Sequence, residues 1–158
     1  MKKVSFIPLS MLTLMTCFCY FRCKKGENFD CKGRNTPSNI VLYNKPLPVI
    51  QCTIQGKWKC VYGKGGIAVN TIQYYDGFYR SFANNKIIQI YNGDTIANNS
   101  IKWVWDRGTY TNGENTFTMK LYDKENVPWV YVVDRILDDT LILHDYSSDA
   151  VFYHFIRL

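Results

Sequence analysis

The sequence predicts an all-β protein, an antiparallel up-and-down barrel of about eight strands. From Thr53 to the C-terminus, short apolar or alternating runs follow one another, and no segment shows a helical period. Strands joined by tight turns are antiparallel, because parallel neighbours need a long crossover. A sandwich of two sheets fits the same pattern and stays open as the alternative. The connections are rich in residues typical of tight turns, at Asn84-Asn85, Asn92-Gly93, Asn112-Gly113, Asp138-Asp139 and Ser147-Ser148-Asp149.

The first strand is expected over Thr53 to Tyr62, because its side chains alternate in character. Trp58 and Cys60 fall on one parity and Lys57 and Lys59 on the other, which indicates one buried and one solvated face. Trp58 is therefore expected to be fully buried. The same reasoning places the other strands at about 71–82, 86–91, 101–111, 115–122, 128–137, 140–146 and 151–158.

Length and composition favour one globular domain. The chain has 158 residues, of which 47% are hydrophobic and 16% aromatic, enough for one core but not for two comfortable domains. The formal net charge of +6 includes Lys2 and Lys3, and the remaining basic residues are scattered among acidic ones. The sequence has no basic arm of the kind that binds nucleic acid, so a nucleic-acid partner is not expected.

The N-terminus has the layout of an export signal. Lys2 and Lys3 give it a positive start, and an apolar run follows from Val4 to about Met15. This run is short for a bilayer span, which needs about 20 residues. The apolar character continues as far as Phe21, so an uncleaved signal anchor stays open as an alternative.

The window Leu14 to Cys17 resembles a bacterial lipobox, in which the cysteine becomes lipidated. The resemblance implies a signal peptide over residues 1–16 and a lipid anchor on Cys17, with Cys19 and Cys23 as alternatives. Phe18 follows this cysteine in place of Asp, which resembles sorting to an outer membrane. We therefore expect an outer-membrane lipoprotein of the cell envelope that faces the periplasm or the cell exterior, with the membrane as a partner through its N-terminal lipid.

Residues 17–52 are expected to form a tether or a segment that wraps around the domain, because they show little regular pattern and contain prolines. Export permits disulfides, and Cys31 with Cys52 is the candidate pair. Spacing alone does not fix the connectivity, so other pairings stay open. Cys60 lies on the buried parity and is expected to be a free thiol. No Cys-x-x-Cys pair occurs, so no zinc site is expected.

Gly56-Lys57-Trp58 in the first strand, together with Arg157 in the last, resembles the signature of the lipocalin and calycin barrels. In those families the tryptophan lies at the closed end of the barrel, and a basic residue from the final strand packs across its indole. The resemblance implies that Trp58 and Arg157 are a barrel-closing pair and that Gly56 belongs to the signature. An arginine over an indole contributes about 1 to 2 kcal/mol when desolvated.

A closer resemblance is to the lipocalin-like domains of exported lipoproteins from Bacteroidota. It covers residues 53–158 and implies a lipocalin-like β-barrel domain over that range. Residues 71–137 contribute no motif to it. The segments that carry the resemblance are Gly56–Lys59, Gly65–Ile67, Thr140–Asp145 and Phe152–Arg157.

Aromatic residues on the predicted strands indicate a ligand cavity. The lining expected from the sequence is Trp103, Trp105, Tyr110, Trp129 and Tyr131. We expect a lipid-anchored binding protein for a small apolar or amphipathic ligand, not an enzyme, with no cofactor and no metal. Such side chains also fill small barrels, so a solid-core structural or protein- or glycan-interaction module stays open as an alternative.

Catalytic residues are not expected. The histidines, His144 and His154, fit half-buried or surface positions on strands. A distant alternative is a hydrolase with carboxylates at the barrel mouth, which would have to face one cleft. Its candidate carboxylates are Asp138, Asp139, Asp145 and Asp149.

Overall fold

The computed structural model describes residues 37–66, 71–107, 113–123 and 126–158, which are mostly β-sheet. The expected signal peptide, Cys17, Cys31 and Tyr110 lie outside the described residues. The described part contains one helix and eleven strands. These are β1 (Ile40–Val41), α1 (Leu47–Thr53), β2 (Gly56–Gly65), β3 (Ile72–Tyr74), β4 (Phe78–Ala83), β5 (Lys86–Tyr91), β6 (Asp94–Ser100), β7 (Lys102–Arg107), β8 (Asn115–Tyr122), β9 (Pro128–Leu137), β10 (Thr140–Asp145) and β11 (Val151–Arg157).

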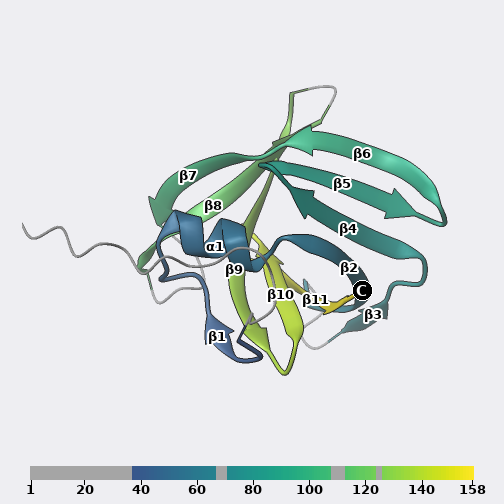
Figure 1. The fold of residues 1–158 in the computed structure, drawn as a ribbon, viewed down its shortest axis with the longest axis horizontal. Coiled ribbons are helices and arrows are strands. Elements are labelled where there is room, and N and C mark those ends of the chain that lie inside the picture. The colour runs from purple at the N-terminus through teal and green to yellow at the C-terminus, as the bar shows by residue number, and fades with distance from the viewer. Residues whose placement is uncertain (1–36, 67–70, 108–112, 124–125) are drawn as a thin grey trace, which may run out of the picture.

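Nine strands form one antiparallel sheet in the order β6-β5-β4-β2-β11-β10-β9-β8-β7, while β1 pairs with β9 and β3 with β2. The sheet curls through 230° into an open half-barrel (Figure 1). The predicted all-β antiparallel architecture is therefore confirmed, in a single sheet and not in the sandwich. The predicted closed barrel is wrong.

The half-barrel stays open because of how its two edge strands are connected. β6 and β7 lie at opposite edges of the sheet, yet only Ile101 separates them in the chain. The shortest common hairpin loops have two residues, so a one-residue link does not let these strands pair along their length. They run apart from their shared corner, as Figure 1 shows. The Asn99 side-chain amide donates a hydrogen bond to the Tyr122 carbonyl across this corner.

The predicted turn residues connect neighbouring strands. Asn84-Asn85 joins β4 to β5, Asn92-Gly93 joins β5 to β6, and Asp138-Asp139 joins β9 to β10. Both residues of each pair have positive φ angles, between 48° and 90°. Two-residue hairpin loops of this type need positive φ at both positions, which Asn, Asp and Gly tolerate best.

Several elements differ from the sequence prediction. β1 was not predicted, and the first predicted strand begins at Gly56, not at Thr53. Residues 47–53 form α1 although no helix was expected, because its seven residues are too few to show a helical period and its prolines suggested a tether. Pro48 lies in the first turn of α1, where a missing N–H is tolerated. The strand predicted at 71–82 is divided at Gly77 into β3 and β4, and β6 was not predicted at all. No helix among the described residues is long and apolar enough to cross a membrane.

The core fills one end of the half-barrel. Trp58 of β2 and Phe155 of β11 are fully buried on the concave face, together with Leu42 and with Ile50 of α1. The segment before Thr53 therefore supplies part of the core and covers this end of the curled sheet. We call it the packed end.

Candidate functional site: an aromatic cavity with a buried arginine

At the packed end, Trp58 and Arg157 attach α1 to the sheet. The Trp58 indole N–H donates to the Ile54 carbonyl at 2.8 Å. The guanidinium carbon of Arg157 lies 4.4 Å from the centroid of the indole. Its Nη2 donates to the Thr53 carbonyl at 3.0 Å and its Nη1 to the Gln55 carbonyl at 3.4 Å. Carbonyls at a helix C-terminus lack partners within the helix, so this pair satisfies them.

Gly56 joins α1 to β2 in a conformation that favours glycine. Its φ is +114°, which residues with a side chain rarely adopt. A Cβ at this position would have room, since the nearest atom, Nη1 of Arg157, would lie 3.9 Å away. The backbone conformation, and not the available space, therefore accounts for the glycine.

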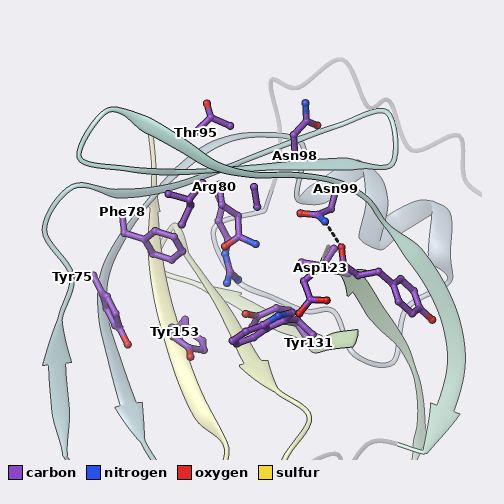
Figure 2. A pocket seen from close by; sticks show the side chains of 15 residues that line it. Tyr75, Phe78, Arg80, Thr95, Asn98, Asn99, Asp123, Tyr131 and Tyr153 are labelled. Atoms are coloured by element: carbon purple, nitrogen blue, oxygen red, sulfur yellow. Dashed lines mark hydrogen bonds between the residues drawn. The ribbon is translucent and has the colours of Figure 1, made fainter. Parts of the chain in front are cut away.

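The opposite end of the half-barrel, which we call the open end, is hollow. A cavity of about 740 Å³ lies there on the concave face of the sheet, with residues of β6 on one side and residues of β4, β8, β9 and β11 around the rest. Figure 2 shows the labelled aromatic side chains and Arg80 around this space, whereas Thr95 and Asn98 point away from it. Its walls include aromatic residues, polar and apolar residues of β6 and two charged residues. They include Tyr75, Phe78, Trp129, Tyr131 and Tyr153, then Thr95, Ile96, Ala97, Asn98 and Asn99, and finally Arg80 and Asp123.

Arg80 lies at the inner wall of this cavity and is almost fully buried, with 2% of its surface exposed. Four aromatic rings surround it within the distance of a cation–π contact. Figure 2 shows the side chain directed from β4 toward Tyr131 and Tyr153. The guanidinium carbon lies 4.4 Å from the ring centroid of Tyr131, 5.3 Å from that of Phe155, 5.4 Å from that of Phe78 and 5.6 Å from that of Tyr153.

The Arg80 guanidinium is not fully satisfied by the protein. Its Nε and Nη1 are buried, and neither has a hydrogen-bond partner within the described ranges. No ion pair joins Arg80 to a carboxylate in this part of the chain. Arginine is a permanent cation with five N–H donors, and buried donors without partners are rare and costly. Ring faces attract the charge but do not replace these hydrogen bonds, so Arg80 keeps free binding capacity.

Neutral groups predominate around this cation. Burial raises the pKa of the Tyr153 hydroxyl well above its ordinary value, and burial raises the pKa of the Cys60 thiol to about 12. The charge of Arg80 lowers both values but does not outweigh burial. Asp123 is the carboxylate on the cavity wall, and it accepts a hydrogen bond from the Val127 backbone N–H at 2.7 Å.

The structure divides the residues that were predicted to line the cavity. Trp129 and Tyr131 do line it. Trp103 lies near the other end, where its indole N–H donates to the Asn85 side chain at 3.2 Å. Trp105 is 54% exposed and packs against Phe117 of β8, outside the cavity.

Arg80 was not predicted from the sequence, although a signal for it exists. Phe78, Arg80 and Phe82 share one parity on β4, so the arginine stands on the apolar face of its strand. Charged residues are rarely buried unless they are paired. An arginine between two phenylalanines on the buried parity is therefore the pattern that marks this position.

Of the histidines and turn carboxylates, only His154 and Asp149 line one pocket, of about 520 Å³, and the others are not part of its lining. His144 is buried against Phe152, and His154 stacks on Tyr62 with ring centroids 4.2 Å apart. Burial and the nearby Lys64 lower the pKa of His154. No group of three potential metal ligands occurs among the described residues. Asp138 and Asp139 precede β10, whereas Asp145 and Asp149 lie at and beyond its other end.

The disulfide prediction is only partly within the described residues. Cys52 at the end of α1 is disulfide-bonded, and Cys31 lies outside the described part. Cys60 is a buried free thiol.

The chain matches no protein-family model, no curated protein and no solved structure. The resemblance to lipocalin-like domains therefore stays a prediction, and what is established is the curled antiparallel half-barrel. Function has to be inferred from the cavity and the residues around it.

Proposed function

We propose that the protein binds a small apolar or amphipathic ligand in the cavity at the open end of the half-barrel. The observation that carries this proposal is the cavity itself, about 740 Å³ in volume, with aromatic side chains at six of its fifteen lining residues. Small-molecule sites usually have about 300 to 1,000 Å³ and combine an apolar lining with a few polar groups.

The rim of the cavity supports an apolar or amphipathic ligand. Trp129 is 59% exposed and Ile96 is 58% exposed, and both line the cavity. Large apolar side chains held at the mouth of a cavity offer surface that a ligand would cover. A solid-core interaction module accounts for the packed end but not for this space. The hydrolase alternative gains no support, because its carboxylates lie toward opposite ends of β10.

Titration with Nile red, a neutral apolar dye, tests directly whether the cavity binds an apolar ligand. We expect saturable binding with increased dye fluorescence. The substitution Ala97→Trp, which fills the cavity, should weaken binding at least tenfold, and Trp129→Ala should weaken it severalfold. Trp105→Ala is the matched control, since Trp105 is similarly exposed but lies outside the cavity. Absence of saturable binding to the wild-type protein would contradict the proposal.

Native mass spectrometry of the protein purified from its own host identifies what the cavity carries. The expected result is an added mass that is lost on denaturation and that Ala97→Trp reduces. Protein that never carries an added mass and also fails to bind Nile red would favour the interaction module.

We further propose that Cys17 carries a lipid that anchors the protein to a membrane of the cell envelope, as the lipobox resemblance implies. Cys17→Ser should move the protein from the membrane fraction to the soluble fraction. Cys19→Ser is the matched control and should leave it in the membrane fraction. Retention of the Cys17→Ser variant would point to Cys19, to Cys23 or to an uncleaved anchor.

A further inference from the structure

We propose that Arg80 is the ligand-binding residue of the cavity, and that the ligand is a small monocarboxylate with an apolar body. This inference rests on the proposed function, because it requires that the cavity hold a ligand.

The first argument is the unmet hydrogen-bonding capacity of Arg80. Its Nε and Nη1 are buried without partners in the described part of the chain, and the residue lines the cavity. Charge-assisted hydrogen bonds to an anion are about twice as strong as neutral ones. A ligand that brings acceptor oxygens would satisfy donors that the protein leaves open.

The second argument concerns the shape and charge of that anion. The planar guanidinium matches a carboxylate, which accepts two parallel hydrogen bonds from it. Asp123 already places one carboxylate on the same cavity wall. A doubly charged phosphate would bring a second negative charge that Arg80 alone does not neutralise, so a group with one negative charge fits better.

The third argument is the layout of the cavity between Arg80 and the rim. Tyr131 and Tyr153 lie next to the guanidinium, at 4.4 Å and 5.6 Å between its central carbon and their ring centroids. Farther out, Trp129 and Ile96 offer exposed apolar surface. A ligand with its carboxylate at Arg80 would therefore place an apolar body against these residues.

Isothermal titration calorimetry with decanoate and decanol separates charge recognition from apolar binding, because the two probes share an alkyl chain. The wild-type protein should bind decanoate at least tenfold more tightly than decanol. Arg80→Met should reduce this preference to within twofold. A wild-type preference below twofold, or a preference that survives Arg80→Met, would overturn the proposal.

Further probes and variants give each outcome its own meaning. Failure of the wild-type protein to bind decanoate, decanol or Nile red would refute the proposed ligand binding in the cavity. Equal binding of decanoate and decanol would refute only the role of Arg80.

Decyl phosphate should bind more weakly than decanoate, and tighter binding would overturn the carboxylate assignment. Arg80→Lys keeps the charge without the planar fork and should give an intermediate preference. Arg157→Met is the matched control and should keep the full preference.

Discussion

Arg80 and Arg157 flank the same tryptophan, yet their guanidinium groups have different partners. Arg80 on β4 and Arg157 on β11 are both Cα partners of Trp58 on β2. The Arg157 guanidinium covers the indole and donates to two carbonyls at the end of α1. The Arg80 guanidinium lies among four rings where the packed end meets the cavity, and its Nε and Nη1 lack partners in the described residues.

The difference between the two arginines separates a stabilising contact from a binding contact. Every N–H that Arg157 gives to a carbonyl of the fold is unavailable to a ligand, and it helps to hold α1 on the sheet. Arg80 contributes less to the fold, because its desolvation is offset only in part by the rings. Functional sites commonly contain residues that lower the stability of the fold, and favourable contacts elsewhere in the structure compensate for them.

The largest effect is expected at the residue between the two arginines. Trp58→Ala should lower the free energy of unfolding by about 3 to 5 kcal/mol, because it removes a large, fully buried side chain. Urea denaturation followed by circular dichroism measures this change. Trp105→Ala, at an exposed position, should change it by about 0.5 kcal/mol or less. A similar result for the two variants would show that the packed end does not hold the half-barrel together.

Replacing the paired arginine should have the next largest effect. Arg157→Met should lower the free energy of unfolding by about 1 to 2 kcal/mol, since it removes the cation–π contact and leaves the carbonyls of Thr53 and Gln55 without their donor. The same denaturation experiment measures it. Unchanged stability would mean that the contacts of Arg157 are replaced by water without loss.

Replacing the unpaired arginine should change stability in the opposite direction. Arg80→Met should raise the free energy of unfolding by about 1 kcal/mol, because it substitutes an apolar side chain for a desolvated charge without an ionic partner. Denaturation of Arg80→Met and Arg157→Met side by side gives the comparison. A loss of stability in both variants would remove the distinction between the two arginines.

The smallest effect concerns Cys60, which neighbours both Trp58 and Arg80. Its pKa of about 12 lies above the ordinary 9.0, so the thiol stays protonated until the pH approaches 12. At pH 8 only about one molecule in ten thousand would carry the reactive thiolate. Iodoacetamide, followed by peptide mass spectrometry, should therefore leave Cys60 unmodified in the native protein and modify it in urea. Rapid modification in the native state would indicate that the packed end opens.

The elements that are short apolar or alternating runs could be predicted from the sequence. The ranges expected for residues 86–91, 115–122 and 128–137 coincide with β5, β8 and β9, because residues 115–122 alternate between apolar and polar side chains and the other two ranges are short, mostly apolar runs next to turn residues. The expected contact of Arg157 with Trp58 is present as well. Its setting differs, because α1 covers this end of an open sheet.

The remaining features depend on tertiary structure. β6 contains Asp94, Asn98 and Asn99, residue types that strands usually avoid, and pairing with β5 makes it a strand. The cavity could be only half predicted for the same reason, since β6 forms one of its walls. Local composition also gave no reason to expect that the sheet would stop curling before its edges met.

The open sheet has a further consequence for how the protein behaves among copies of itself. A closed barrel has no free strand edges, whereas β6 and β7 end the nine-strand path on either side. Exposed edges invite pairing with other chains, and polar or charged side chains discourage it. β6 is rich in Asn, and β7 carries Lys102, Asp106 and Arg107. The polar residues because of which β6 was not predicted as a strand thus also protect an exposed sheet edge against aggregation.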